Sequence, residues 1–256
     1  MSAEAAPERV AKRIARSGFC SRRDAERLIA AGRVAVDGAV LSSPAVTVTA
    51  ANQVTIDGEA LPRIEQARLF RYHKPAGVLT AARDPAGRPT IYDRLPEELP
   101  RLMPIGRLDM GSEGLLLLTN DGELKRRLEL PATGWLRRYR VRVHGRVDES
   151  TLEALKNGIA LDGFQYGPIQ ATLDRVQGSN AWLTVALREG KNREIRRVLE
   201  HFGWPVNRLI RLSFGPFQLG GLAPGALEEV PAKVLAEQLG ARAVRAPRGR
   251  SSPRKP

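Results

Sequence analysis

Residues 104–122 read Pro-Ile-Gly-Arg-Leu-Asp-Met-Gly-Ser-Glu-Gly-Leu-Leu-Leu-Leu-Thr-Asn-Asp-Gly, and this stretch decides how the chain is organised. Its four consecutive leucines, bounded by turn residues, predict a buried strand at 115–118. The Thr-Asn-Asp-Gly that follows predicts a turn or a helix cap. Before the leucines lies a glycine-rich polar loop that carries Arg107 and Asp109. Glycine lets a backbone approach a ligand closely, so this loop is a candidate site for chemistry.

The composition points to a globular protein with a polyanionic partner. The chain has 256 residues, is 42% hydrophobic and carries a formal net charge of +13. Such an excess of positive charge favours nucleic acid, and it is preferred over a membrane because no basic amphipathic helix stands out. No apolar run approaches the length of a membrane span, and the N-terminus lacks the apolar core of a signal peptide. With Cys20 as its only cysteine, the chain is expected to be cytoplasmic and free of disulfides.

The first sixty residues predict two short basic helices followed by short strands. The first helix spans 8–17 and ends at Gly18, and the second begins after a cap at Ser21 and closes at Gly32. Asp37-Gly38 and a second Asp-Gly pair at 57–58 predict hairpin turns. The charge of the helices alone could mark a solvated face or an RNA-binding face.

A resemblance favours the RNA-binding alternative. Residues 21–38, Ser-Arg-Arg-Asp-Ala-Glu-Arg-Leu-Ile-Ala-Ala-Gly-Arg-Val-Ala-Val-Asp-Gly, closely resemble the small αL RNA-binding module named after a small-subunit ribosomal protein, and the similarity covers about residues 8–60. The module implies contacts between helix cations and RNA phosphates. Here these would be Arg13, Arg22, Arg23 and Arg33.

The remainder of the chain mixes strands and helices. Strands are expected at 69–72, 78–81 and 209–212, and helices at 123–130, at 151–156 with Ser150 as cap, and at about 195–202. Residues 138–144 alternate arginine or histidine with apolar residues and tyrosine, which predicts a half-exposed strand with cations on one face. Basic residues crowd the start of the 195–202 helix, where they oppose the helix dipole. Their placement suggests a polyanion or a carboxylate as partner.

Most catalytic patterns are missing from the sequence. The three histidines show no metal-ligand spacing, and there is neither a phosphate-binding glycine loop nor a nucleophile elbow. Asp109 has the most unusual setting of the carboxylates. An aspartate there could act as nucleophile, as general base, or simply as the ion-pair partner of Arg107.

Four blocks in order resemble the pseudouridine synthases that modify ribosomal RNA. They are residues 73–77 (His-Lys-Pro-Ala-Gly), 106–124 around Asp109, the strand beginning Arg138-Tyr139, and 190–197 (Gly-Lys-Asn-Arg-Glu-Ile-Arg-Arg). The pattern is closest to the large-subunit type B branch. The wider superfamily often has His-Gln where this chain has Arg193-Glu194. The type B branch tolerates Arg-Glu there, so this difference favours that branch over the other subfamilies. The implied fold class is α+β: a mixed, mainly antiparallel sheet with flanking helices, preceded by the αL module.

The resemblance also implies domain boundaries and a chemistry. It gives 8–67 as the RNA-binding domain and linker and 68–238 as the catalytic domain. Composition predicts a frayed end at 1–7 and a basic disordered tail at 239–256, which either binds RNA non-specifically or only solubilises the protein. A uridine would be flipped into the cleft, its glycosidic bond broken, and the uracil rejoined through a ring carbon. Asp109 would act on the nucleotide as a nucleophile or by abstracting a sugar proton. No cofactor or metal is implied.

The other site residues take supporting roles in this comparison. Tyr139 would stack on the uracil and could take the proton that leaves the new carbon. Ile195 would pack against that tyrosine, and Arg196 would pair with and orient Asp109. Arg107 would fill the space left by the flipped base. Phosphate contacts are expected from Lys74, Lys191, Arg193 and Arg211.

The expected partner is ribosomal RNA, with 23S favoured and a pre-ribosomal particle as one form of it. A monomer is expected. Three other functions stay open at this point. One is small-subunit RNA as the target, the second is a non-catalytic ribosome-binding or assembly factor that keeps the fold, and the third is a basic module that acts as a translational regulator.

Overall fold

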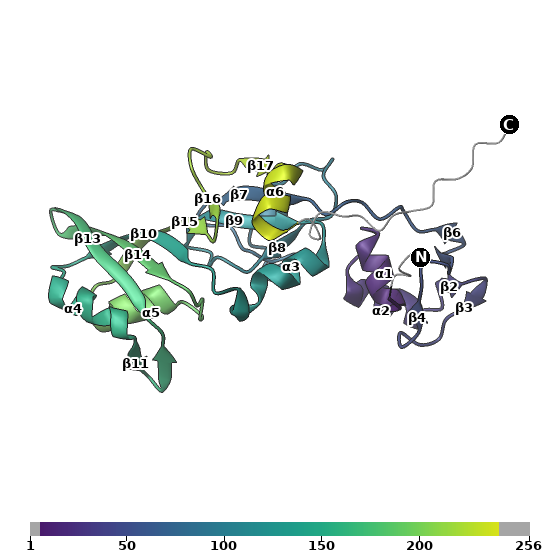
Figure 1. Ribbon diagram of the computed structural model, residues 1–256, viewed down its shortest axis with the longest axis horizontal. Coiled ribbons are helices and arrows are strands. Elements are labelled where there is room, and N and C mark those ends of the chain that lie inside the picture. Colours follow the sequence, from purple (N-terminus) through teal and green to yellow (C-terminus); the bar gives the residue numbers. More distant parts are fainter. Residues whose placement is uncertain (1–5, 241–256) are drawn as a thin grey trace.

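The computed structural model describes residues 6–240, and it forms an elongated molecule with a small N-terminal unit at one end (Figure 1). Of the predicted basic tail at 239–256, residues 241–256 lie outside the described residues, whereas Leu239 is a buried helix residue, so the boundary was placed too early. The small unit has its own core of valine, isoleucine and alanine side chains, all from residues 10–56. Its elements are α1 (Val10–Arg16), α2 (Arg22–Ala30), β1 (Glu8–Arg9), β2 (Val34–Val36), β3 (Ala39–Val40), β4 (Thr47–Val48), β5 (Val54–Ile56) and β6 (Glu59–Ala60).

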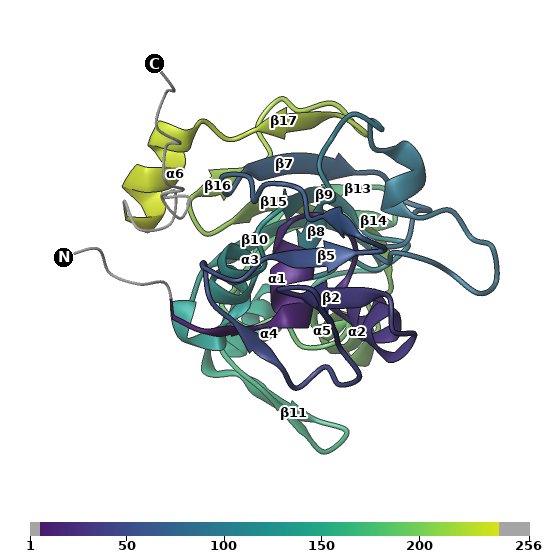
Figure 2. The same cartoon turned by 90° about the vertical axis from the view of Figure 1, so that its right-hand side faces the viewer.

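Local signals position these elements. The Ser21 hydroxyl accepts a hydrogen bond from the Asp24 backbone N–H and so caps α2, as predicted. Asp37 and Gly38 both have positive φ, at 50° and 84°, the conformation of a two-residue hairpin turn. The prediction was wrong at Glu8 and Arg9, which pair as a short strand with β4 instead of starting α1. Figure 2, which faces this unit, shows α1 behind β2 and β5.

The larger unit is built on a nine-stranded sheet in the order β13-β14-β10-β15-β9-β7-β17, with β16 beside β15 and β8 beside β9. Every pairing in it is antiparallel except that of β9 with β15, which confirms the mixed, mainly antiparallel sheet. The strands are β7 (Leu69–Lys74), β8 (Met103–Ile105), β9 (Glu113–Thr119), β10 (Arg137–His144), β13 (Ile169–Gln177), β14 (Asn180–Leu187), β15 (Val206–Phe214), β16 (Phe217–Gln218) and β17 (Leu227–Glu229).

Helices cover the sheet in two groups. One core joins α4 (Glu149–Ala154) and α5 (Glu194–His201) to the inward side chains of β10, β13 and β14. A second core joins α3 (Gly122–Glu129) and α6 (Ala232–Leu239) to β9 and β15. The predicted leucine strand is the interior of β9, and Leu115 and Leu116 are fully buried. A small hairpin of β11 (Ile159–Leu161) and β12 (Phe164–Tyr166) and three short 3-10 turns at Ile91–Arg94, Pro131–Thr133 and Leu155–Asn157 complete the unit.

Two local predictions in the larger unit were wrong. Residues 78–81 form no strand; only a single bridge joins Leu79 to Thr90. The cap of α4 is Asp148, which accepts from the Thr151 backbone N–H, so the helix starts before the predicted Ser150. At α4 the Asp148 carboxylate takes the capping role, and the Ser150 hydroxyl instead donates to that carboxylate. Among residues 6–240, no helix is long and apolar enough to cross a membrane.

Candidate active site

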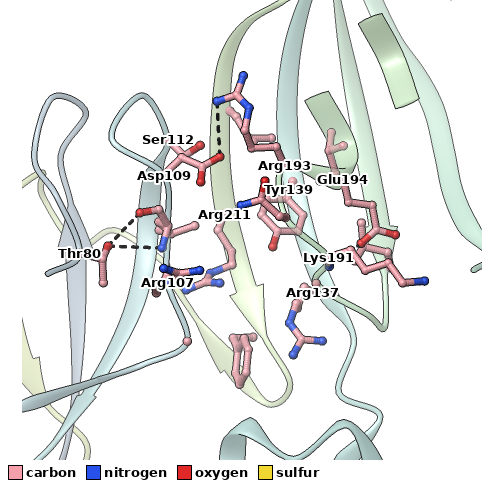
Figure 3. A pocket seen from close by; sticks show the side chains of 18 of the residues that line it. Thr80, Arg107, Asp109, Ser112, Arg137, Tyr139, Lys191, Arg193, Glu194 and Arg211 are labelled. Atoms are coloured by element: carbon pink, nitrogen blue, oxygen red, sulfur yellow. Dashed lines mark hydrogen bonds and ion pairs between the residues drawn. The ribbon is translucent and has the colours of Figure 1, made fainter. Parts of the chain in front are cut away.

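A cleft of about 570 Å³ lies where β9 meets β15, and its lining comes from both halves of the sheet. Figure 3 shows Thr80, Arg107 and Asp109 on one side and Arg137, Tyr139 and Glu194 on the other. Its volume falls within the range of small-molecule pockets. Its lining is rich in arginine, so the cleft suits an anionic ligand.

The loop that carries Asp109 is held through its backbone. The Lys74 ammonium donates to the carbonyls of Asp109 and Ser112 at 3.1 and 2.7 Å. The Thr80 hydroxyl donates to the Leu108 carbonyl at 2.9 Å. These bonds fix the main chain on both sides of Asp109 and leave its side chain 36% exposed at the cleft.

Lys74 therefore corrects one prediction. It was expected to contact phosphate, but it is fully buried and bonded to carbonyl oxygens, so it cannot reach RNA. Burial lowers the pKa of Lys74 to about 8, while Asp109 and Glu113 act in the opposite direction. Its role in this structure is to hold the Asp109 loop.

The expected pairing of Asp109 with Arg196 is a second correction. The Asp109 carboxylate lies 3.9 Å from the Arg193 guanidinium, whereas Arg196 donates to the carbonyls of Gly111 and Val206 at 3.0 and 2.9 Å. Arg196 is 8% exposed, and burial lowers its pKa. It ties α5 to the loop after Asp109 and to β15. The Arg107–Asp109 ion pair that the local sequence allowed is likewise not formed within the described residues.

Tyr139 and Ile195 meet in one core at the cleft wall, and both are at least nine-tenths buried. The strand register places Tyr139 opposite Arg211. Arg211 is only 3% exposed: its Nε donates to the Leu115 carbonyl, and one terminal nitrogen has no hydrogen-bond partner. Its guanidinium is buried at the cleft wall, so it is not the exposed phosphate contact that the resemblance implied. Arg107 is exposed and lines the same cleft.

The turn before α5 contains a carboxylate pair that the sequence did not reveal. Glu194 is 3% exposed and accepts from the Lys191 backbone N–H at 2.9 Å. Burial, together with neighbouring Glu189, raises the pKa of Glu194 to about 7. The predicted phosphate contact Lys191 forms an ion pair with Glu189 at 2.7 Å and stays half-exposed. The αL conformation of Arg193, with φ of 51°, then directs the chain into α5.

Further lining residues were also missed. Arg137 begins β10, lines the cleft and has its pKa lowered by burial. The Ser112 hydroxyl is buried without a hydrogen-bond partner. An arginine at the start of a strand and a serine in a glycine-rich loop carry no sequence signal of their own, because only the fold brings them to the cleft.

The four arginines of the N-terminal unit that were predicted to contact RNA phosphates differ in exposure and in ion-pair partners. Arg22 and Arg23 are exposed at the start of α2. Arg13 lies 3.6 Å from Glu8. Arg33 is exposed, and both its Nε and a terminal nitrogen bond the Asp57 carboxylate, which the two hairpins bring beside it. An exposed ion pair is weak and does not prevent a phosphate contact, so the contact by Arg33 stays a prediction.

Together, the fold and the cleft define a nucleic-acid-modifying enzyme. A basic N-terminal unit precedes a sheet whose cleft sets one fixed carboxylate across from a buried tyrosine. Such a site can receive a base extruded from its stack and act on its sugar or ring. Among residues 6–240, no group of histidine, cysteine, aspartate and glutamate side chains gathers in a way that could hold a metal ion.

Comparison with known proteins specifies the class. Residues 68–201 match the RNA pseudouridylate synthase family, and residues 8–59 match the S4 domain. An uncharacterized RNA pseudouridine synthase of Rickettsia felis is 46% identical over 89% of this chain and 99% of the relative. Ribosomal large subunit pseudouridine synthase B of Salmonella typhi is 42% identical over 87% of this chain and 79% of the relative. A crystal structure of a pseudouridylate synthase superposes with a TM-score of 0.63 at 28% identity, covering 90% of this chain and 99% of that one.

The chain belongs to the RNA pseudouridine synthase family and carries an N-terminal S4 domain. It is a pseudouridine synthase that binds RNA through that domain. The resemblance drawn from the sequence blocks is confirmed.

Proposed function

We propose that this protein isomerises a uridine of large-subunit (23S) ribosomal RNA to pseudouridine. The named activity of the Salmonella typhi relative supports the choice of RNA. The carrying observation in the structure is the Asp109 loop, whose carbonyls are fixed by Lys74 and Thr80 so that the carboxylate faces the cleft. A carboxylate held in this way is prepared to act on a nucleotide without loop rearrangement.

In this proposal the target base leaves its stack and enters the cleft between Asp109 and Tyr139. Asp109 acts on the nucleotide, as nucleophile or by removing a sugar proton, and the bond from the ribose to the ring nitrogen breaks. The uracil turns within the pocket and bonds the ribose through ring carbon 5. The proton of that carbon passes to the Tyr139 hydroxyl, and the freed ring nitrogen gains a proton from water, so that the product is an isomer of uridine. Tyr139 stacks on the ring, and Arg193 orients the Asp109 carboxylate. The buried Arg211, with one terminal nitrogen unpartnered, is placed to donate to a polar group of the nucleotide.

The same comparison supports a domain division. We propose that residues 8–67 form the RNA-binding domain with its linker and 68–239 the catalytic domain. The S4 match ends at residue 59, β7 begins at Leu69, and each side has its own hydrophobic core.

Release of tritium from carbon 5 of uridine tests the function. Purified protein is given unmodified 23S or 16S transcripts labelled at that carbon, and release is expected from 23S alone. Asp109→Asn should abolish release and leave RNA affinity within about twofold, because the loop is held through its backbone and not through the carboxylate. Asp121→Asn, a cap residue of α3, is the matched control and should keep full activity.

Two results would overturn separate parts of the proposal. Release from 16S and none from 23S would refute the target. Turnover by Asp109→Asn at the wild-type rate would refute the catalytic assignment.

A further inference from the structure

The sheet has a second basic face, turned away from the cleft. Side chains alternate along β10, so Tyr139, Val141 and Val143 face the core that contains α4 and α5. Arg138, Arg140 and Arg142 consequently face the other side, where Arg138 and Arg140 are exposed. These arginines are the cations of β10 that do not line the cleft.

Cross-strand register assembles these cations into a row. Arg142 pairs with Arg208 of β15 on one side and with Trp182 of β14 on the other, and Trp182 pairs with Arg175 of β13. The row therefore crosses four strands with three arginines and one tryptophan. Arg140, two residues along β10, places its guanidinium 4.8 Å from the centre of the Trp182 ring. We call Arg140, Arg142, Arg175, Trp182 and Arg208 the arginine row.

This arrangement is poorly explained by stability. Like charges directly opposite on neighbouring strands destabilise a sheet. Within the described residues, Arg208 has Glu113 as an ion-pair partner at 2.6 Å, whereas Arg140, Arg142 and Arg175 have no carboxylate within ion-pair distance. Asp174, the nearest acid along β13, instead accepts a hydrogen bond from Thr184. Stacking on one aromatic ring orders the guanidinium groups but leaves their charge unneutralised.

We propose that the arginine row is a second RNA-binding surface, which holds the phosphate backbone of the substrate RNA at a distance from the target uridine. Trp182 is 8% exposed and covered by guanidinium groups, so it supports the arginines and offers no free face for a base. The contacts are thus to phosphate and independent of sequence. That the RNA is ribosomal rests on the function proposed above; the binding of a polyanion does not.

The position of the row defines which RNA can use it. The cleft and the row lie on opposite faces, and β13 forms the edge of the sheet between them. A short stem-loop seated in the cleft cannot bend around that edge, because duplex RNA is stiff over such lengths. A large folded RNA can present one segment to each face.

The test compares Arg140→Gln/Arg175→Gln with Lys156→Gln/Lys233→Gln, which removes the same charge at exposed sites elsewhere. Binding is measured against salt for a 23S domain and for a short stem-loop of uridine-containing RNA. With the long RNA, the arginine variant should lower the slope of log affinity against log salt by about 1.4 to 1.8, the value for two phosphate contacts. With the stem-loop, the slope should not change.

Tritium release provides a second readout. KM for the long RNA should rise about tenfold or more in the arginine variant while kcat stays at the wild-type value, since neither arginine lines the cleft. An affinity and slope for the long RNA equal to those of the lysine control would overturn the proposal and leave the row for an acidic protein segment or for solvent. Because binding is measured without turnover, an inactive wild type would refute the proposed function and not this surface.

Discussion

At the residue scale, burial raises the pKa of one carboxyl group in the cleft wall, that of Glu194, to about 7. Glu194 accepts the Lys191 backbone N–H and lies beside Glu189, which itself pairs with the Lys191 ammonium. Two carboxyl groups this close do not both ionise readily, and the more buried one keeps the proton. The turn that presents Arg193 to Asp109 is therefore held by a group that titrates near neutral pH.

Glu194→Gln tests this titration. The pKa of Glu194 in the fold, about 7, lies above its ordinary value of 4.5. The contribution of Glu194 to the free energy of unfolding is therefore fully present below pH 4.5, and it is lost as the pH rises through 7. The glutamine keeps an acceptor for Lys191 and never ionises. Thermal unfolding should find the variant close to wild type at pH 5 and more stable at pH 8, by up to about 3 kcal/mol.

A matched control is Glu237→Gln, an exposed residue of α6. Its difference from wild type should be the same at both pH values. Parallel curves for Glu194→Gln and wild type would show that the pair does not share a proton in the fold.

The sequence predicted which residues belong to this site better than it predicted how deeply they are buried and what they contact. Asp109 and Tyr139 could be predicted because their motifs are local, and both line one cleft. The burial of Lys74 and Arg211 could not, because a strand pattern says which face a side chain points to and not what closes over it. Arg196 bonds a carbonyl 85 residues away, a contact fixed only when α5 packs beside the Asp109 loop.

At the element scale, the junction of β9 and β15 makes the cleft. This is the one parallel pairing of the nine-stranded sheet. It places β9, the strand that follows Asp109, next to β15, whose Arg211 lies opposite Tyr139 of β10. Gly114 pairs with Arg211 there, with φ of 102°. A Cβ at Gly114 would lie 2.4 Å from the Arg211 carbonyl oxygen. The two halves approach this closely because that position lacks a side chain.

Gly114→Ala should accordingly separate the two halves of the site. The clash is with backbone, which cannot move aside as a flexible side chain can, and the positive φ adds strain for any L-residue. We expect a loss of more than about 3 kcal/mol in the free energy of unfolding, measured by urea denaturation, and no tritium release.

Gly221→Ala is the control, since nothing lies within 4 Å of its added Cβ and its φ is not positive. It should unfold like wild type. A Gly114→Ala protein with wild-type stability would mean that the junction tolerates a wider spacing than the structure indicates.

Element identity was predictable where the determining residues are adjacent in sequence. The Asp37-Gly38 turn and the Ser21 cap each depend on contacts within four residues, and both are present. The register of β10 against β14 and β15 was not predictable, because many alignments satisfy the same alternation. The arginine row exists only in the observed register.

At the scale of the whole molecule, the two units meet at a basic groove. A cavity of about 880 Å³ lies between the N-terminal helices and α3, and the Lys12–Glu123 ion pair at 2.6 Å spans it. Figure 1 shows α1 and α2 at the end of the sheet that bears α3. Arg22 from one unit and Arg126 from the other line this groove, and both are exposed. Neither has a carboxylate partner within residues 6–240.

Cations from two units around one groove predict a single RNA that touches both. Arg22→Gln/Arg126→Gln should weaken binding of even a short stem-loop and lower its salt slope by about 1.4 to 1.8, because the groove lies along α3, whose residues Lys125 and Glu129 also line the cleft. The measurement is affinity against salt, with Lys156→Gln/Lys233→Gln as the charge-matched control. Loss of only half that slope would mean that one arginine faces solvent. No change with either RNA would mean that the units bind RNA independently of the groove, and the N-terminal contacts would then have to come from other faces of α1 and α2.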